Sequence, residues 1–590
     1  MSSVTRVFDL LDHSRQKFNK EDIVCWKDKN VWFKYTTADF ISVVDQISRG
    51  LIALGIKKNE KVGVMSGNRP EWNICDFAIM QIGATQVPMY PTLSNTDIKF
   101  ILNDAGVKIV FASNKELADK IAPVCSETSV KIFTFDTVEG YANYSEVIEL
   151  GKNHESTNLQ TFRDNVTPDD LLTLIYTSGT TGTPKGVMLT HNNLVSNFTI
   201  CSKLFPEGYN KALSFLPLSH IFERMVVYMY FYLGISVYYA ESTDTIVADM
   251  NEVNPHGFTT VPRLLEKVYD KIVAKGNEQT GIKRKIFFWA LKLGLNYEFD
   301  GKNGWWYELQ LSLANKLVFT KWREALGGNI KAIISGGAAL QPRLARVFWA
   351  AKIPILEGYG LTETSPVIAV NGFGATKFGT VGKPINNVEV KIAEDGEIMF
   401  KGPNLMKGYY NRPDLTADIF DQDGFYHTGD IGELSADGYL CITDRKKEMF
   451  KTAGGKYIAP QMLENKYKEC PLIEQVMVVG ENRRFPSALI VPSFEALSKW
   501  CELHGFAFSS KEEMIKDSHV IEKYQQEINK YNQGFGHWEQ VKKFALLPKE
   551  WSIESGEMTP KLSFKRKVIL EKNKDIVDQI YNDPRHVEVP

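Results

Sequence analysis

The chain has 590 residues, more than a single hydrophobic core usually organises, so at least two domains are expected. Hydrophobic residues make up 44% of the chain and charged residues 24%, which is the balance of a soluble globular protein. The formal net charge of −2 provides no bulk positive field, so a nucleic-acid partner is not expected.

Cysteine usage and the start of the chain predict a cytoplasmic protein. The seven cysteines are dispersed without a Cys-x-x-Cys pair, which is typical of reduced thiols and not of a disulfide framework or zinc site. Residues 1–20 mix charges with isolated apolar residues, and no signal peptide is visible. The most apolar run, residues 225–240, is interrupted by Gly234, and its Val, Ile and Tyr content suits a buried strand. We therefore expect it in the core and not across a membrane.

Helix and strand signals alternate along the first part of the chain. We expect helices over residues 37–54, 70–82 and 94–104, and strands over 61–65, 85–89, 107–112, 213–216 and 330–334. Short connections between such elements predict a mostly parallel sheet covered by helices, an α/β fold.

A polar, glycine-rich segment follows the apolar run 171–176, which has the length and composition of a buried strand. Glycine permits a close approach of the backbone, so amide groups, hydroxyls and one lysine can bind phosphate here. A Walker loop is excluded, because Pro184 precedes Lys185 and Gly186 stands where a magnesium-binding hydroxyl should be. The candidate phosphate ligands are Thr177, Ser178, Gly179, Thr180, Thr181, Gly182 and Lys185.

Residues 264–326 form a long section rich in helix formers and aromatic residues, including Trp305 and Trp306. Such a section can be a helical cap on the core. Alternatively, some of its aromatic residues line an acyl tunnel or contact a membrane surface, where aromatic residues concentrate.

The pattern changes after about residue 381. Residues 394–396 and 436–438 lie between β-rich runs, as hairpin turns do. The charged segment 444–448 then interrupts the β pattern, so we place a domain boundary at Asp444. A helix near 461–468, strands near 475–479 and 488–491, and a helical tail are expected beyond it.

Further motifs follow the phosphate loop in a fixed order, at residues 335–338, 357–364, 426–430, 444–445 and 451–456. With them the chain resembles the adenylate-forming superfamily of acyl-CoA synthetases, luciferases and adenylation domains, over nearly its whole length. It is most similar to the long-chain fatty acyl-CoA synthetases, on residues 216–224 and 261–263.

The resemblance implies a fold and a domain organisation. It implies a large N-terminal domain, residues 1–443, of mostly parallel helix-covered sheets with a β-rich subdomain and a helix-rich insertion at about 264–326. A hinge over residues 444–447, with Asp444 and Lys447, would lead into a small mobile α+β domain, residues 448–590.

The resemblance also implies a reaction. A long-chain fatty acid is activated by ATP to acyl-AMP with release of pyrophosphate, and CoA then displaces AMP. The implied cofactors are ATP, Mg²⁺ and CoA, and the implied partners are these molecules and the fatty acid. An insoluble substrate and the aromatic residues near Trp305 suggest peripheral membrane contact, whereas no oligomeric state is implied.

Nucleotide contacts carry over from the family to matching residues of this chain. Tyr359 would stack on adenine beside the backbone of Gly337 and Ala338. Asp430 would bind the ribose diol, and Arg445 a ribose or phosphate group. The ATP/AMP-binding set implied in this way consists of the phosphate-loop residues with Gly337, Ala338, Glu357, Gly358, Tyr359, Gly360, Thr362, Asp430 and Arg445.

Metal, catalytic and CoA roles carry over in the same way. Thr177 and Glu363 would bind Mg²⁺, although Glu363 could instead be a helix-cap carboxylate. Thr362 would contact the α-phosphate. His220 would lie beside the substrate carboxylate, although a lone histidine is usually structural. The CoA face is expected at Gly454 and Gly455.

The family's adenylation lysine has no direct match. The family places it three residues after a proline, and here that position holds Ser563, which cannot bridge two anions as a cation does. In a strand Lys561, Ser563 and Lys565 would share a face, so either lysine could substitute, with Lys561 preferred. Two alternatives therefore stay open: a fatty acyl-AMP ligase that loads a carrier protein, and a non-catalytic nucleotide- or lipid-binding homologue.

Overall fold

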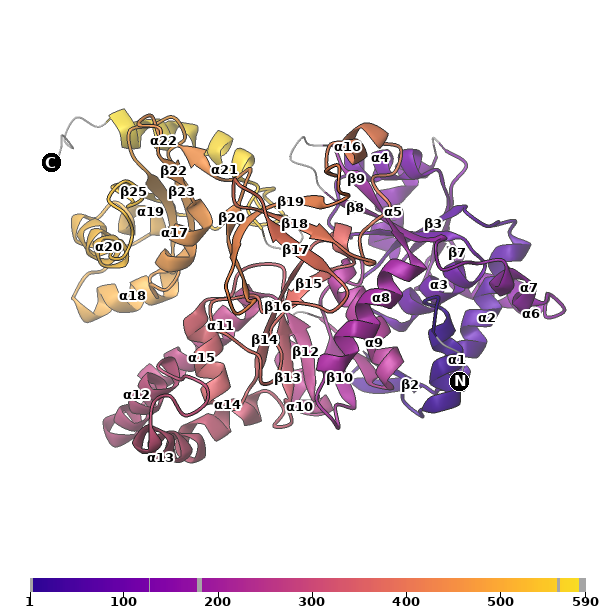
Figure 1. The fold of residues 1–590 in the computed structure, drawn as a ribbon, viewed down its shortest axis with the longest axis horizontal. Coiled ribbons are helices and arrows are strands. Elements are labelled where there is room, and N and C mark those ends of the chain that lie inside the picture. The colour runs from indigo at the N-terminus through magenta and orange to yellow at the C-terminus, as the bar shows by residue number, and fades with distance from the viewer. Residues whose placement is uncertain (1–3, 127, 178–182, 243, 560–562, 583–590) are drawn as a thin grey trace. The chain divides into compact units, whose positions relative to one another are not determined.

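The computed structural model describes residues 4–582 apart from 127, 178–182, 243 and 560–562 (Figure 1). The chain divides into two compact units. The larger unit comprises Met1–Lys391, Met399–Thr428 and Ser435–Leu440, and the smaller comprises Ile392–Ile398, Gly429–Leu434 and Cys441–Pro590.

A seven-stranded sheet of the larger unit is parallel except at one edge, where β9 runs antiparallel to β8. Its order is β7-β6-β5-β3-β4-β8-β9. The strands are β3 (Lys61–Met65), β4 (Thr85–Met89), β5 (Val107–Ala112), β6 (Lys131–Thr134), β7 (Ala142–Asn143), β8 (Leu171–Thr177) and β9 (Lys185–Thr190).

A nine-stranded sheet of the same unit has the order β16-β15-β14-β13-β12-β10-β11-β1-β2. Its six central strands, from β14 to β1, are parallel, and the remaining strands are antiparallel to their neighbours. The strands are β1 (Val24–Asp28), β2 (Val31–Tyr35), β10 (Lys211–Ser214), β11 (Ser236–Tyr239), β12 (Gly257–Thr260), β13 (Ala332–Ser335), β14 (Ile355–Gly360), β15 (Val367–Val370) and β16 (Lys383–Pro384). The expected α/β fold with mostly parallel sheets is confirmed.

Helices cover both sheets (Figure 1). Hydroxyl side chains cap the N-termini of several of these helices. For example, Thr36 accepts a hydrogen bond from the Asp39 amide at the start of α2. The helices are α1 (Asp9–Lys17), α2 (Thr37–Ala53), α3 (Pro70–Gln81), α4 (Asn95–Ala105), α5 (Lys115–Cys125), α6 (Tyr144–Lys152), α7 (Leu159–Asp164), α8 (His191–Cys201), η1 (Ser202–Leu204), α9 (Ile221–Leu233), α10 (Ile246–Val253), α11 (Pro262–Asn277), α12 (Gly281–Leu295), α13 (Trp305–Ala314), η2 (Asn315–Phe319), α14 (Thr320–Ala325), α15 (Pro342–Ala350), η3 (Thr362–Thr364) and α16 (Pro413–Ala417).

The apolar run 225–240 lies in the core as expected, but the strand interpretation holds only for its end. Residues up to Leu233 belong to helix α9, and Gly234 ends this helix with φ of 70° before β11 begins. The helix is buried nearly all round, so its sequence lacks the polar face that marks a helix. No helix in the described part of the chain combines the length and apolar character needed to cross a membrane.

A four-stranded sheet, β17-β18-β19-β20, carries the expected hairpin turns, and the division between the two units crosses its strands. Residues 394–396 and 436–438 connect its strands, as predicted. The charged segment, however, begins inside a strand, because β20 continues through Asp444 and Arg445. The strands are β17 (Glu389–Ile392), β18 (Glu397–Lys401), β19 (Tyr426–Leu434) and β20 (Leu440–Arg445).

The rest of the smaller unit is α+β, as expected. A three-stranded sheet, β23-β24-β25, has apolar clusters on its two faces, one around Tyr467 and Tyr524 and the other around Trp551 and Ile569. The elements are β21 (Phe450–Lys451), β22 (Tyr457–Ile458), α17 (Pro460–Tyr467), β23 (Ile473–Val479), β24 (Ser487–Pro492), α18 (Phe494–Leu503), α19 (Lys511–Met514), α20 (Ser518–Tyr531), β25 (Lys543–Leu546), α21 (Arg566–Lys572) and α22 (Lys574–Asn582).

Candidate functional site

The expected phosphate loop connects the antiparallel strands β8 and β9. Thr177, the last residue of β8, pairs with Lys185, the first residue of β9. The two residues therefore mark the two ends of the loop. The other candidate ligands, Ser178, Gly179, Thr180, Thr181 and Gly182, lie outside the described residues.

Lys185 and Glu363 both contact Tyr409. Lys185 Nζ is 5.1 Å from the centroid of the Tyr409 ring, and the Tyr409 hydroxyl donates to Glu363 Oε1 at 2.9 Å. Burial, reinforced by the Glu363 carboxylate, raises the pKa of Tyr409. The phenol therefore keeps its proton and remains a donor to Glu363.

Backbone hydrogen bonds hold this tyrosine against β9. The Lys407 amide donates to the Met188 carbonyl (3.0 Å), and the Tyr410 amide donates to that of Gly186 (2.8 Å). The Met406 amide donates to the carbonyl of Glu363 itself (2.8 Å). Residues 406–410 thus connect η3, which carries Glu363, to the strand that carries Lys185.

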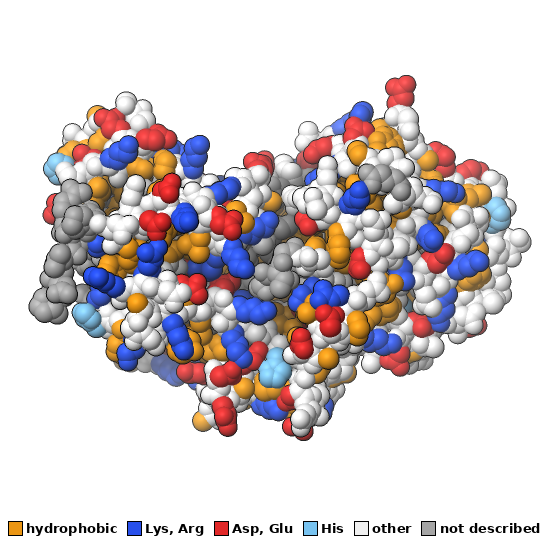
Figure 2. All heavy atoms as spheres, turned by 90° about the horizontal axis from the view of Figure 1, so that it is seen from above, with side chains coloured by type: hydrophobic (Ala, Val, Ile, Leu, Met, Phe, Trp, Pro, Cys, Tyr) orange, Lys and Arg blue, Asp and Glu red, His pale blue; other side chains and the backbone are white. Residues whose placement is uncertain are grey.

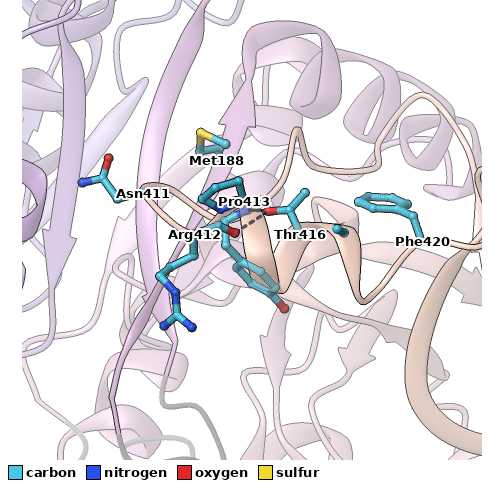
Figure 3. Close-up of a pocket in the computed structure, with 8 residues that line it drawn as sticks. Met188, Asn411, Arg412, Pro413, Thr416 and Phe420 are labelled. Carbon is cyan, nitrogen blue, oxygen red and sulfur yellow. Dashed lines mark hydrogen bonds between the residues drawn. The ribbon is translucent and has the colours of Figure 1, made fainter.

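An open cavity of about 500 Å³ borders the same segment. Figure 3 shows Met188, Pro413 and Phe420 beside it, with Thr416 hydrogen-bonded to the chain around Arg412. Its lining is Met188, Tyr409, Asn411, Arg412, Pro413, Thr416, Ala417 and Phe420. Met188 and Tyr409 therefore line this cavity and also belong to the two segments, β9 and residues 406–410, that are hydrogen-bonded to each other near Lys185.

The two expected adenine-binding segments belong to neighbouring parallel strands: residues 337–338 follow β13, and residues 357–360 are part of β14. Ser335 at the end of β13 pairs with Glu357 on β14, so Gly337 and Ala338 leave the sheet beside the strand segment 357–360. The Leu340 amide donates to Glu357 Oε1 at 3.0 Å. Burial raises the pKa of Glu357 to about 8.

The second half of this motif is closely packed. A Cβ atom on Gly360 would lie 1.7 Å from the Pro366 carbonyl oxygen, so only glycine fits there. Asn404 Nδ2 donates to the Thr364 carbonyl (2.6 Å) and holds the turn that contains the buried Thr362. Tyr359, Tyr409 and Glu363 all lie close enough to the buried Tyr426 to influence its pKa, which burial raises.

His220 is the N-cap of α9. Its Nδ1 accepts a hydrogen bond from the Phe222 amide at 3.1 Å, which is the structural role that a lone histidine can have. The first turn of α9 is anchored to two strands by Glu223, whose carboxylate accepts hydrogen bonds from the hydroxyls of Ser214 (2.6 Å) and Thr259. Burial raises the pKa of Glu223 to about 7.

The expected donor set for Mg²⁺ is the Glu363 carboxylate and the Thr177 hydroxyl. In the described part of the chain no three or more His, Cys, Asp or Glu side chains group as a metal site. Mg²⁺ commonly takes one or two protein oxygens together with substrate phosphates and water. A carboxylate and a hydroxyl therefore fit an Mg²⁺ ion that binds together with the nucleotide phosphates.

In the smaller unit, the expected ribose ligands lie on neighbouring strands. Arg445 Nε is 3.0 Å from Asp430 Oδ1, and the Asp430 side chain is buried whereas that of Arg445 is half exposed. Glu397 supports this pair: it accepts hydrogen bonds from the Gly429 amide and from Lys446 Nζ, each at 2.8 Å.

The expected hinge begins with a buried carboxylate. Asp444 Oδ1 accepts a hydrogen bond from the Arg445 amide (2.6 Å), and Oδ2 accepts one from the Gln461 amide (3.0 Å). These bonds explain why β20 continues through Asp444. Burial raises the pKa of Asp444 to about 7. Lys447 lies in the turn that follows β20.

The expected CoA loop is the turn between β21 and β22. Gly455 has φ of 75°, a left-handed conformation that favours glycine, and its amide donates to the Thr452 carbonyl at 2.9 Å. Gly454 precedes it in the same turn. Beside it, Lys456 Nζ is 5.3 Å from the ring centroid of Trp538.

The two candidate lysines differ in what the structure shows. Lys561 lies outside the described residues, whereas Lys565 is exposed and directly precedes α21. In the described part of the expected strand, Phe564 forms an antiparallel β-bridge with Met558, and the Thr559 amide donates to the Ser563 carbonyl at 2.8 Å. The shared face of Lys561 and Lys565 stays a prediction, because residues 560–562 lie outside the described part of the chain.

Two family models match the chain in succession. Residues 11–410 match the AMP-binding enzyme family, and residues 448–585 match the AMP-binding enzyme C-terminal domain. The chain belongs to the AMP-binding enzyme family.

Several known proteins are similar to this AMP-binding enzyme over almost its whole length. The long-chain-fatty-acid–CoA ligase FadD15 of Mycobacterium bovis is 34% identical over 560 residues, which are 94% of this chain and 93% of that protein. The adenylation domain of a carboxylate reductase from Mycobacterium chelonae has the same fold, with TM-score 0.76 and 22% identity over 98% of this chain and 91% of that one. The o-succinylbenzoate-CoA synthetase of Bacillus subtilis, solved with ATP and a magnesium ion, gives TM-score 0.67 and 20% identity over 95% and 98%.

In this AMP-binding enzyme, the structure groups the sequence-predicted residues within each unit. The larger unit brings together Thr177, Lys185 and Glu363, and it places Gly337 and Ala338 beside residues 357–360. The smaller unit pairs Asp430 with Arg445.

Sequence reasoning missed the side chains that support these groups. Tyr409 donates a hydrogen bond to Glu363, and Glu397 accepts one from the amide of Gly429, which precedes Asp430. Glu223 accepts one from Ser214 and so anchors the helix that His220 caps. The only local signal for Tyr409 is a glycine followed by two tyrosines at residues 408–410. No local sequence pattern marks Glu397 or Glu223 as a supporting residue.

Proposed function

We propose that this AMP-binding enzyme is a long-chain fatty acid–CoA ligase that works through acyl-AMP. The similarity to the long-chain-fatty-acid–CoA ligase FadD15, which extends over nearly the whole of both chains, is the observation that carries this proposal. It uses ATP, Mg²⁺ and CoA and produces acyl-CoA, AMP and pyrophosphate.

In the first half-reaction a fatty carboxylate oxygen attacks the α-phosphorus of ATP, and pyrophosphate leaves. Lys185 and the loop 178–182 bind the phosphates, and Thr362 contacts the α-phosphate. His220, fixed at the start of α9, lies beside the carboxylate. Mg²⁺, held by Glu363 and Thr177, would neutralise phosphate charge. The protein's contribution is mainly to position two anions and lower their repulsion.

The adenosine part of ATP is the proposed ligand of Tyr359, the backbone of residues 337–338, Asp430 and Arg445. Adenine stacks on Tyr359 and meets the backbone of Gly337 and Ala338. Asp430 accepts the two ribose hydroxyls, and Arg445, its ion-pair partner, supplies a permanently charged fork of donors. The buried position of Asp430 supports this role, because it fixes the carboxylate direction.

In the second half-reaction the CoA thiolate attacks the acyl carbon, and AMP leaves. We assign residues 1–443 to an adenylate-forming domain, 444–447 to a hinge and 448–590 to a mobile domain that presents its CoA face, with Gly454 and Gly455, after adenylation. The left-handed turn at Gly455 supports a loop backbone that a ligand can approach closely.

A cation from the C-terminal segment completes the adenylation site, and Lys561 or Lys565 supplies it. Lys565 is exposed, so its ammonium group is accessible to a substrate anion. The enzyme works in the cytoplasm, and peripheral membrane contact gives it access to an insoluble acid. Each methylene buried from water contributes about 0.8 kcal/mol, so a long acyl chain supplies a large share of the binding energy.

A substrate screen tests the proposal directly. Saturated acids from short to long chain are incubated with the purified protein, ATP, Mg²⁺ and CoA, and AMP and acyl-CoA are measured. We expect acid-dependent AMP formation that is greatest with long chains. Acyl-AMP that accumulates while CoA is not consumed would indicate a carrier-loading ligase instead, and no AMP from any acid would contradict the proposal.

The same assay assigns the cation. In the variants Lys561→Ala and Lys565→Ala we expect one to lose pyrophosphate release by about 100-fold, the size of effect typical of a charge that acts in the transition state. If pyrophosphate release survives in both variants, neither lysine has this role.

A further inference from the structure

One helix of the larger unit has two apolar faces, of which only one is packed. On the inner face of α13, Leu311 and Ala314 are buried in the core. The Tyr307 hydroxyl donates to the Leu293 carbonyl of α12 at 2.6 Å, and Trp289 of α12 donates from Nε1 to Gln310 at 3.2 Å. These contacts fix the rotation of the helix about its axis, so the outer face is a stable surface.

The outer face is a continuous apolar stripe. Trp305 exposes 78% of its surface, and Leu313, two turns further on, exposes 50%. Residues spaced by about four lie on one face of a helix, and the wider turn of the π-helix η2 keeps the next member, Leu317, near the same line. The stripe consists of Trp305, Trp306, Leu309, Leu313 and Leu317.

Scattered exposed apolar residues are normal on proteins, but a contiguous stripe of five is not. At 1.5 Å per residue, the stripe from Trp305 to Leu317 is about 18 Å long. In Figure 1, α12 and α13 lie side by side at an edge of the larger unit. On the inner side α13 packs against α12, which in turn contacts α11 and α15. The stripe therefore faces away from the protein core.

The charges around the stripe have one dominant sign. Between residues 279 and 325 the exposed ionisable residues are seven cations and two acids, Asp300 and Glu324, while Glu298 and Glu308 are partly exposed. The cations are Lys283, Arg284, Lys285, Lys292, Lys302, Lys316 and Lys321. This excess contrasts with the net charge of −2 of the whole chain, and with the face in Figure 2, where basic and acidic side chains are interspersed.

We propose that the stripe of α13 and η2 is a docking surface for an anionic lipid bilayer. Its tryptophans and leucines enter the boundary between headgroups and acyl chains, and the flanking cations contact lipid phosphates. Lys316, which lies next to Leu317, can extend its ammonium group to the headgroups while its stem stays in the apolar layer. This surface is the location of the membrane contact included in the proposed function. The physical argument for the surface does not depend on that function, which supplies only the reason for an enzyme of this kind to bind a membrane.

Charge is the reason to choose a bilayer over a second copy of the chain. A self-complementary interface would bring the same excess of cations against itself, which is unfavourable. An anionic membrane, in contrast, attracts each nearby Lys or Arg by about 1 kcal/mol.

Vesicle flotation tests the surface without requiring activity. The full chain is mixed with vesicles of phosphatidylcholine alone or with added phosphatidylglycerol, and the floating fraction is measured. We expect binding to the anionic vesicles that weakens with salt. The double variant Leu309→Glu/Leu313→Glu should lower it about ten-fold or more, because two apolar side chains of the docking face become charged.

A matched control uses Leu503, which exposes 84% of its surface at the end of α18 in the smaller unit. Leu503→Glu adds the same kind of charge at an exposed leucine outside the stripe and should float like the wild type. A second variant, Lys283→Glu/Lys285→Glu, changes only exposed side chains and should weaken binding to anionic vesicles while leaving the melting temperature unchanged.

Three outcomes overturn the assignment. The first is that the wild type stays at the bottom with anionic vesicles. The second is that the stripe variant floats as well as the wild type. The third is that sedimentation shows a dimer of the wild type but a monomer of the stripe variant. AMP formation from a short, water-soluble acid, measured on the same samples, separates this result from the enzymatic proposal. Loss of flotation with AMP formation intact supports the docking surface.

Discussion

The Tyr409 hydroxyl orients the carboxylate that is proposed to bind Mg²⁺. Its pKa is raised, so it donates to Glu363 Oε1 throughout the physiological pH range. Groups that hydrogen-bond to a metal ligand typically change metal affinity by 10–100-fold when removed. We therefore expect Tyr409→Phe to require about ten-fold more Mg²⁺ for half-maximal AMP formation, with a smaller change in the rate at saturating Mg²⁺.

The neighbouring tyrosine provides the matched control. Tyr410 lies next along the chain, and Lys61 Nζ lies 5.1 Å from its ring centroid, a contact that phenylalanine preserves. Tyr410→Phe should therefore leave the Mg²⁺ dependence unchanged. Initial rates against Mg²⁺ concentration decide the question: coincident curves for the wild type and both variants would remove Tyr409 from any role at the metal.

At the scale of residues, the sequence predicts which residues contact ligands but gives no signal for those that support them. Glu363, Lys185 and Asp430 occur in motifs whose order is characteristic of a family. Tyr409 lies 46 residues from Glu363 along the chain, and nothing local to either residue signals their hydrogen bond. Contacts of this kind depend on how strands and loops pack, which a single sequence does not encode locally.

At the scale of elements, Glu357 near the middle of β14 makes the stability of the larger unit depend on pH. Burial raises its pKa from about 4.5 to about 8. The unfolded chain loses this proton near pH 4.5, whereas the folded chain retains it up to about pH 8. Stability therefore falls as the pH rises through this range, because the folded state holds more protons than the unfolded state.

Glutamine keeps the acceptor for the Leu340 amide but cannot ionise. We expect Glu357→Gln to raise the melting temperature relative to the wild type by about 2 °C or more at pH 8.5, and by less at pH 5.5. Thermal unfolding at the two pH values measures this difference. Glu394→Gln, which changes an exposed glutamate in a turn, should show no such trend. An advantage of Glu357→Gln that is equal at both pH values would contradict the raised pKa.

Most elements of the larger unit could be predicted because their patterns are local. The strand at 61–65 and the helices at 37–54 and 70–82 were found within one residue at each end, since periodicity and caps mark them. Helix α9 was missed because it is buried nearly all round.

At the scale of the whole molecule, the proposed two-step reaction would require the proposed hinge, residues 444–447, to change conformation between steps. β20 ends at Arg445, and the following turn is closed by bonds from the amides of Glu448 and Met449 to the Arg445 carbonyl, at 2.9 and 3.0 Å. Lys447 lies within this turn, so a φ/ψ change there would redirect everything that follows. Asp444, by contrast, accepts hydrogen bonds from two backbone amides and would be the fixed end of the proposed hinge.

Proline at residue 447 should therefore separate the two half-reactions. Its ring fixes φ near −65° and also restricts Lys446, which precedes it. We expect Lys447→Pro to keep acid-dependent ATP–pyrophosphate exchange within about three-fold of the wild type, while acyl-CoA formation falls about ten-fold or more because the second conformation is not reached. Lys447→Ala removes the same side chain without restricting the backbone, so both rates should stay near those of the wild type. Equal losses of exchange and acyl-CoA formation in the proline variant would mean that this turn supports the fold and is not the hinge.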